Sequence, residues 1–207
     1  MADQIAVELR RSAEAPAAFA HVTLVRPPVL TIAGSLSTHG PVPPLGLAYL
    51  AAVLGDAGHR VSVVDAAGEG IDQVSTVDSP VGPLHRRGLT LDEVVNRIPT
   101  DTDIIGVTLM FVHEWPETRE LLKHIRRAHP EAHILIGGET ATSFWRWMFE
   151  QSDAIDYVVL GEGETTALQL VDRLTAGSPV DDLQGVVVRD PDKEPRSGGL
   201  PARMRQL

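Results

Sequence analysis

Two glycine-rich turns carry the residues of this sequence that are best suited to contact a ligand. The turns read "GGET" and "GEGE", and each one ends an apolar run and precedes a helix-forming segment. Because glycine has no β-carbon, a ligand can approach the backbone closely at such turns. The candidate binding residues in them are Gly137, Gly138, Glu139, Thr140, Gly161, Glu162, Gly163 and Glu164.

A purely structural interpretation of the same turns is also open. The glycines can serve only to let a strand turn into a helix, with Glu162 and Glu164 at the positive end of a helix dipole. Each turn taken alone favours this interpretation. A dinucleotide fingerprint would need glycine in place of Thr166 and would follow the first strand, and the sequence contains no phosphate-binding G-x-x-x-x-G-K-S/T motif.

The eight histidines suggest metal binding, but their spacing does not support it. His124, His129 and His133 span a helix end, a loop and a strand start, so we expect them to be exposed rather than to converge. His39 and His113 instead follow the first and third expected strands, where either is a candidate ligand contact. Ser35, Ser37 and Thr38 beside His39 lack the strand-turn-helix setting of a hydrolase nucleophile, which argues against hydrolysis.

Composition excludes several classes of protein. The 207 residues are 43% hydrophobic and 22% charged, which indicates a globular domain with a real core. No apolar run approaches the roughly 18 residues that cross a bilayer, so we expect no membrane association and a cytoplasmic location. The net charge of -10 argues against nucleic acid as a partner, and the absence of cysteine removes iron-sulfur ligation from this chain.

The elements that must position these residues alternate along the chain. Strands are expected at 21–26, 60–66, 103–110, 132–138, 156–161 and 184–190, and helices at 43–58, 90–98, 116–128, 143–152 and 165–177. Thr90 and Glu93 form a capping box at the start of one helix. The segments 27–42 and 68–88 are expected to be loops, and an aromatic cluster at 144–149 is expected to pack in the interior.

This alternation predicts a doubly wound α/β fold. Near-continuous apolar strands indicate a mostly parallel sheet of five to six strands covered on both faces, as in flavodoxin-like and Rossmann-like folds. Ligands of such sheets bind beyond the carboxyl ends of the strands, so the relevant loops follow strands one, three, four and five. We expect a lead-in at 1–20, the binding domain at 21–178, and a final strand with a linker at 179–207.

Four blocks together carry a family resemblance. "PPLGLAYLAAVLGDAGHRVSVVDA", "DIIGVTLM", "ILIGGETAT" and "DYVVLGEGETTALQLVDRL" resemble, in order and spacing, the cobalamin-binding domain of radical S-adenosylmethionine enzymes over residues 21–190. The resemblance implies cobalamin bound with its nucleotide tail extended into the domain, against the backbone of Gly138. It adds Pro44, Leu45, Gly46, Thr108, Leu109, Met110 and Phe111 as candidate contacts, with Leu109 or Met110 facing the lower side of the corrin.

The resemblance also implies a cobalt without a protein imidazole. In cobalamin domains of the methionine-synthase type, a D-x-H-x-x-G loop supplies a histidine to cobalt. Here "SLSTHGPVPPLG" has Ser37 where that motif has aspartate, and Gly40 comes too early. The departure agrees with the radical-enzyme branch of the family, which lacks this loop.

The catalytic half of that family binds an iron-sulfur cluster and S-adenosylmethionine through a Cys-x-x-x-Cys-x-x-Cys motif that this sequence lacks. The resemblance therefore implies a radical S-adenosylmethionine catalytic domain as partner, in the same longer chain or in a separate protein, and most simply methyl transfer as the reaction. Two alternatives remain open: a non-catalytic flavodoxin-like interaction or signalling module, and a flavin- or nucleotide-binding protein.

Overall fold

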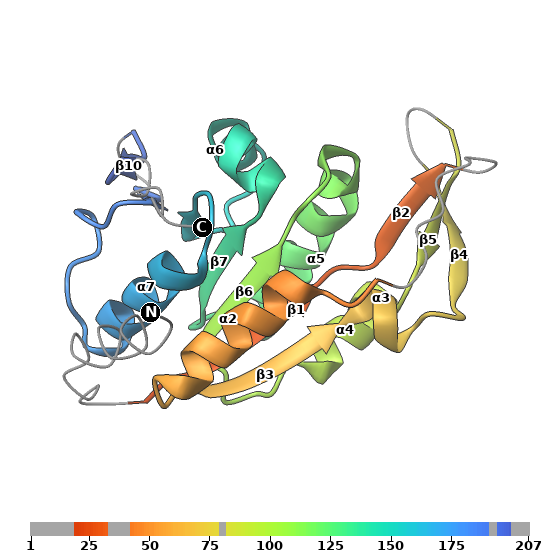
Figure 1. The fold of residues 1–207 in the computed structure, drawn as a ribbon. Coiled ribbons are helices and arrows are strands. Elements are labelled where there is room, and N and C mark those ends of the chain that lie inside the picture. The colour runs from red at the N-terminus through yellow and green to blue at the C-terminus, as the bar shows by residue number, and fades with distance from the viewer. Residues whose placement is uncertain (1–18, 33–41, 79–81, 191–193, 200–207) are drawn as a thin grey trace, which may run out of the picture.

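A central sheet of seven strands organises the chain. The computed structural model describes residues 19–32, 42–78, 82–190 and 194–199 (Figure 1). The strands of the central sheet are β1 (His21–Arg26), β3 (Arg60–Asp65), β6 (Ile104–Thr108), β7 (His133–Gly137), β8 (Tyr157–Val159), β9 (Val186–Val188) and β10 (Arg196–Ser197). Their order is β10-β9-β8-β7-β6-β1-β3.

The five strands from β3 to β8 are parallel, which confirms the predicted doubly wound fold. The chain runs from β1 outward to β3 and then returns to β6 on the other side of β1. Strand order therefore reverses between β1 and β6, and their carboxyl ends flank the point where such sheets bind ligands. The final predicted strand, β9, pairs antiparallel to β8, and β10 pairs antiparallel to β9.

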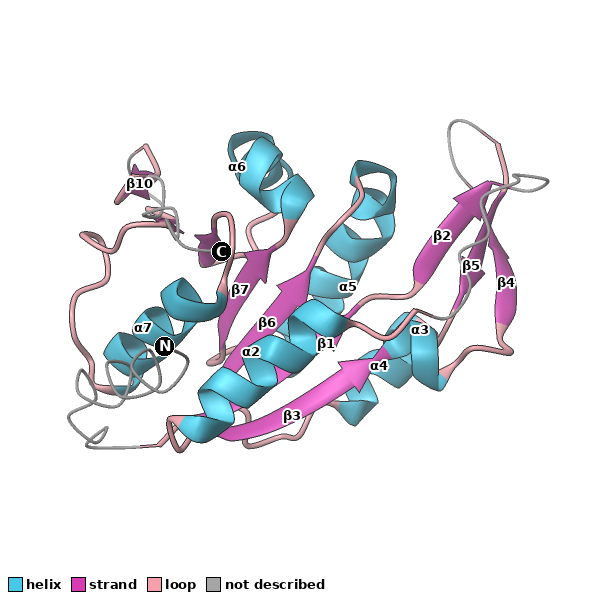
Figure 2. Ribbon diagram, viewed as in Figure 1, coloured by secondary structure: helices cyan, strands magenta, loops and turns pink. Residues whose placement is uncertain are grey.

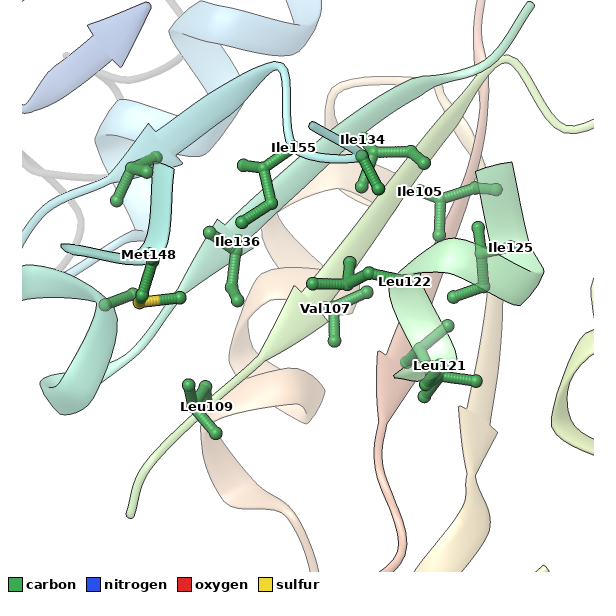
Figure 3. Close-up of a cluster of buried hydrophobic side chains, with 14 of the residues drawn as sticks. Ile105, Val107, Leu109, Leu121, Leu122, Ile125, Ile134, Ile136, Met148 and Ile155 are labelled. Atoms are coloured by element: carbon green, nitrogen blue, oxygen red, sulfur yellow. The ribbon is translucent and has the colours of Figure 1, made fainter. Parts of the chain in front are cut away.

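Helices cover both faces of this sheet. They are α2 (Leu45–Asp56), α3 (Ala66–Glu69), α4 (Leu91–Arg97), α5 (Trp115–Ala128), α6 (Glu139–Gln151) and α7 (Glu164–Thr175), with a 3-10 turn η1 (Val112–Glu114) before α5. Side chains of α2 and α7 share one buried cluster with one set of strand residues. Side chains of α4, α5 and α6 share the other, part of which is drawn in Figure 3.

Alternation along the strands explains how one sheet serves two cores. Ile134 and Ile136 of β7 join the cluster under α5 and α6, whereas Leu135 between them joins the cluster under α2 and α7. Figure 3 shows Ile136 on the same side of β7 as Leu122 of α5 and Met148 of α6. Both faces are therefore apolar, as the near-continuous apolar strands predict.

The local sequence pattern at the start of α4 is also confirmed. Thr90 and Glu93 form the predicted capping box, with the Thr90 hydroxyl accepting from the Glu93 N–H and the Glu93 carboxylate accepting from the Thr90 N–H. In α5, which lies close to the helix predicted at 116–128, one face is buried, with Thr118, Leu121, Leu122 and Ile125.

The loops predicted at 27–42 and 68–88 contain a second sheet, so that prediction was wrong. Strands β2 (Val29–Ile32), β4 (Val74–Val77) and β5 (Leu84–Arg87) form an antiparallel sheet in the order β2-β5-β4. Figure 2 shows it set apart from the central sheet, beyond the carboxyl end of β1. β4 carries mostly exposed side chains, so it has no apolar run that would mark it as a strand.

Two smaller expectations also need correction. His129 is buried rather than exposed, and burial lowers the pKa of its imidazole. In the aromatic cluster, Trp145 and Phe149 pack in the interior as predicted, whereas Phe144 and Trp147 are exposed. No helix among the described residues is both long and apolar enough to span a bilayer.

Candidate functional site

A cavity of about 230 Å³ opens where the carboxyl ends of β6, β7 and β8 meet α2 and α7. Its walls are mainly apolar, and five of the apolar residues that line it belong to the core cluster shared by α2, α7 and the sheet. These five are Leu24, Leu47, Leu50, Leu135 and Val159, and Ala167 of α7 also lines the cavity. The cavity thus lies beside the reversal of strand order, on the face of the sheet that α2 and α7 cover (Figure 1).

Both glycine-rich turns contribute to this cavity. The predicted residues that line it are Gly46, Thr108, Met110, Gly137, Gly138, Gly161, Glu162, Gly163 and Glu164. They come from four separate segments of the chain, and the fold brings them to one place. The Thr108 side chain forms no hydrogen bond with another described residue, so its hydroxyl is available to a ligand.

The other predicted residues lie around the cavity rather than in its walls. Pro44 is the N-cap of α2, and Leu45 is the exposed first residue of that helix. Phe111 is half exposed in the loop after β6, and Glu139 is the exposed first residue of α6. The Thr140 side chain is buried and donates a hydrogen bond to the Met110 carbonyl oxygen.

The prediction that the Leu109 side chain contacts a ligand needs correction. Its side chain is fully buried in the core cluster under α5 and α6 (Figure 3). Its backbone is also occupied, because the Leu109 N–H donates to Gly137 and its carbonyl accepts from Thr140. Met110, which is 51% exposed and lines the cavity, is the residue of the pair that can reach a ligand.

The glycines of the cavity have different physical reasons to be glycine. Gly138 has a φ of 105°, and a β-carbon there would lie 2.5 Å from the Leu109 carbonyl oxygen. Gly161 also has a positive φ, at 68°. A β-carbon at Gly46 would meet no atom within 4 Å, so this position is open to the cavity without being required by the backbone.

Among the described residues, the charged side chains that line the cavity are acidic. Glu162 and Glu164 are the charged residues among those that line it, and no lysine, arginine or histidine belongs to the described lining. His113 points its Nε2 at the Leu30 carbonyl oxygen at 3.1 Å, and His39 lies outside the described residues, as do Ser35, Ser37 and Thr38. Within the described part of the chain, no group of three or more histidine and acidic side chains could hold a metal ion.

The first turn of α6 links the loops on either side of it. Thr140 binds the loop after β6, as described above. The Thr142 hydroxyl donates to the Gly138 carbonyl oxygen at 3.0 Å and accepts from the Gly161 N–H at 2.9 Å. Thr142 was not predicted as a site residue, because its partner is 19 residues away and only the parallel pairing of β7 with β8 brings the two together.

Sequence reasoning also missed the apolar walls. Leu24, Leu47, Leu135 and Val159 read as ordinary core positions, and their strand or helix periodicity cannot separate a core residue from one that lines a cavity. Leu50 contacts the same region from α2, since a β-carbon on Gly163 would lie 3.8 Å from it. A wall of this kind appears only when α2, α7 and the sheet are placed together.

These features define a doubly wound α/β ligand-binding domain with a glycine-lined, apolar cavity at the carboxyl edge of its sheet. The family model described as the B12 binding domain matches residues 33–171, and the chain belongs to this family of cobalamin-binding domains. The family resemblance drawn from the sequence is thereby confirmed.

Curated relatives agree with this assignment. The chain is 34% identical over 150 residues to the cytidylyl-2-hydroxyethylphosphonate methyltransferase of Streptomyces wedmorensis, covering 72% of this chain and 28% of that protein. It is 28% identical over 145 residues to the hopanoid C-3 methylase of Methylococcus capsulatus, covering 70% and 24% respectively. The chain therefore spans about a quarter of the length of these two relatives.

Solved structures share the fold. The radical S-adenosylmethionine methyltransferase TsrM from Kitasatospora setae, with cobalamin and an iron-sulfur cluster bound, superposes with a TM-score of 0.64 at 20% identity, covering 91% of this chain and 30% of that one. The cobalamin-dependent S-adenosylmethionine radical enzyme OxsB, with aqua-cobalamin and S-adenosylmethionine bound, gives 0.61 at 19% identity, covering 89% and 22%.

Proposed function

We propose that the cavity between α2 and α7 receives the nucleotide tail of cobalamin, while the corrin ring lies outside its mouth. The observation that carries this proposal is the apolar, glycine-lined cavity of about 230 Å³ beside the reversal of strand order. Sites for complete drug-sized ligands span roughly 300–1,000 Å³. A cavity smaller than that range suits one end of a large ligand, and a planar aromatic base fits its apolar walls.

The charge of the cavity supports a neutral aromatic base over a phosphate at this position. Glu162 and Glu164 would repel an anionic phosphate, whereas their oxygens can accept hydrogen bonds from ribose hydroxyl or amide groups. Flavin and nucleotide ligands that would place a phosphate in this cavity are disfavoured for the same reason. A non-catalytic interaction module would give no account of a cavity at this edge.

The described residues also support a mode of cobalamin binding in which no protein imidazole coordinates the cobalt. No described histidine lines the cavity, and the Nε2 atom of His113 is engaged by the Leu30 carbonyl oxygen. Met110 and Phe111 are about half exposed in the loop after β6, where they offer apolar contact to a flat ring. We therefore propose the base-off form, with Met110 toward the lower side of the corrin.

At the level of the whole enzyme, we propose that this domain holds cobalamin for a radical S-adenosylmethionine methyltransferase. Cobalamin, when bound, supplies a cobalt that can carry a methyl group, and this chain's own part is to hold and orient that cofactor. The methyltransferase names of the relatives support this reaction class. The 207 residues contain no cysteine, so we place the iron-sulfur cluster and S-adenosylmethionine in a catalytic domain elsewhere in a longer chain or in a partner protein.

Substitution at Gly46 tests the proposed site directly. Gly46→Leu places a branched side chain at an open position in the cavity wall, so we expect the Kd for hydroxocobalamin to rise at least about tenfold, or ~1.4 kcal/mol. The measurement is an absorbance titration after desalting, with circular dichroism to confirm folding.

Gly55→Leu is the matched control. Gly55 lies in the same helix, is also exposed, and also has open space at its β-carbon, but it does not line the cavity. Equal affinity of the two variants would contradict the proposed site. A wild-type domain that retains no more cobalamin than a serum albumin control would contradict cobalamin binding itself. That result would favour the alternative of a non-catalytic interaction module.

A further inference from the structure

The first turn of α6 connects both loops that close the candidate cavity. Met110, from the loop after β6, accepts a hydrogen bond from the Thr140 hydroxyl at 2.9 Å. Gly161, from the loop after β8, donates its N–H to the Thr142 hydroxyl, also at 2.9 Å. Met110 and Gly161 both line the cavity, whereas Thr140 and Thr142 do not.

The Thr142 hydroxyl makes two hydrogen bonds in this arrangement, one as a donor and one as an acceptor. It donates to the Gly138 carbonyl oxygen and accepts from the Gly161 N–H, so one side chain fixes the distance between the two glycine-rich turns. The loop that it holds has little other support on that side. Gly161 is exposed, and the side chains of Glu162 and Glu164 form no ion pair or hydrogen bond with other described residues.

The backbone freedom of Gly161 is the reason why the hydrogen bond to Thr142 matters. Its φ of 68° is a conformation that glycine reaches freely in the unfolded chain and that nothing in its own side chain can select. An N–H that donates to a fixed acceptor restricts this freedom. Thr142 therefore helps to fix the position of Gly161, and of Glu162 next to it, in the lining of the cavity.

We propose that Thr142 is a positioning residue that couples the two glycine-rich turns and keeps the cavity open in the cofactor-free domain. This inference rests on the proposed function, because it concerns the site that we assign to the cobalamin tail. The hydroxyl does not touch the ligand. It lowers the conformational freedom that the loop 161–164 must otherwise lose when the ligand binds.

Thr142→Val tests the proposal, because valine keeps the shape of threonine and removes only the hydroxyl. We expect the Kd for hydroxocobalamin to rise about three- to tenfold, as for the loss of one net hydrogen bond. Thr142→Ser keeps the hydroxyl and should restore wild-type affinity. In the apo domain, amide hydrogen exchange at Gly161, measured by NMR, should accelerate in Thr142→Val and return to normal in Thr142→Ser.

Thr175→Val is the matched control. The Thr175 hydroxyl donates to the Val171 carbonyl oxygen four residues earlier, as Thr142 does to Gly138, but it has no second partner in another loop among the described residues. This variant should leave both readouts unchanged. A Thr142→Val domain with wild-type affinity and wild-type exchange at Gly161, or a Thr175→Val domain with an equal loss of affinity, would overturn the role of Thr142. Failure of the wild-type domain to bind cobalamin would instead overturn the proposed function, and exchange at Gly161 would still show whether Thr142 restrains the loop.

Discussion

At the scale of single residues, the two glycines that end β7 have different roles. Gly138 needs its positive φ, and its missing β-carbon makes room for the Leu109 backbone rather than for a ligand. At Gly137, a β-carbon would be 3.6 Å from the Val159 carbonyl oxygen, which is an ordinary contact. The close backbone approach at Gly138 is therefore a requirement of the fold, even though the residue also lines the cavity.

Gly138→Ala should therefore act on stability. We expect the free energy of unfolding of the apo domain to fall by more than about 1 kcal/mol, because alanine is strained at this φ and its methyl group collides with Leu109. Urea denaturation measures this loss, with Gly137→Ala as the milder comparison. A Gly138→Ala domain with unchanged stability and sharply weaker cobalamin binding would restore the direct contact that the sequence suggested for Gly138.

At the scale of elements, the small sheet β2-β5-β4 is tied to the main domain by a nearly buried ion pair. Arg86 of β5 donates to the Glu117 carboxylate in the first turn of α5 at 2.7 Å, and the two side chains are 17% and 9% exposed. Arg86 also donates to the Ser75 hydroxyl of β4. Arg86 therefore links β5 both to β4 and to α5.

Arg86→Met should destabilise the domain by about 3 kcal/mol, because it leaves the Glu117 carboxylate buried without its partner. The double variant Arg86→Met/Glu117→Leu removes both charges and should recover most of this loss. Denaturant unfolding of the wild type, both single variants and the double variant gives the coupling energy. Additive effects of the two substitutions would show that the ion pair does not connect the elements.

At the scale of the whole molecule, the chain spans only about a quarter of the length of the two curated relatives described above. Its composition limits which parts of the expected chemistry this chain can supply. It provides an apolar cavity, to which we assign the cobalamin tail, and no thiolate ligand for an iron-sulfur cluster. Many charged side chains of the described residues form local ion pairs, such as Arg126 with Asp156, and the excess of acidic residues leaves the net charge at -10. In our proposal, the radical chemistry therefore belongs to a further domain.

Anaerobic reconstitution of this chain with iron and sulfide should accordingly yield no cluster absorbance. With S-adenosylmethionine and a reductant, we expect no 5′-deoxyadenosine, because the chain has no cysteine to ligate a cluster. Liquid chromatography with mass spectrometry detects this product at low levels. Its formation by the purified chain, absent from a heat-denatured control, would require a different account of the catalytic centre.

The sequence by itself determined the features that depend on neighbouring residues. Apolar runs and 3.6-residue periodicity located the strands of the parallel sheet and the longer helices, and Thr90 with Glu93 located the start of α4. The glycine-rich turns pointed to the edge of the sheet where the cavity lies, because parallel strands place all their carboxyl ends together. The four resemblance blocks then indicated the family.

Only the tertiary structure decided the features that join distant segments. Strands β2, β4 and β5 are short and partly polar. β2 pairs with β5 across more than 50 residues, β4 pairs with β5 across a short connection, and Arg86 attaches the sheet to α5. The bond from Gly161 to Thr142, the burial of Leu109 and the contact that requires glycine at position 138 likewise depend on which strands are neighbours. Side-chain type and local spacing carry no information about such pairings, because their free energy comes from contacts that form only when the chain has folded.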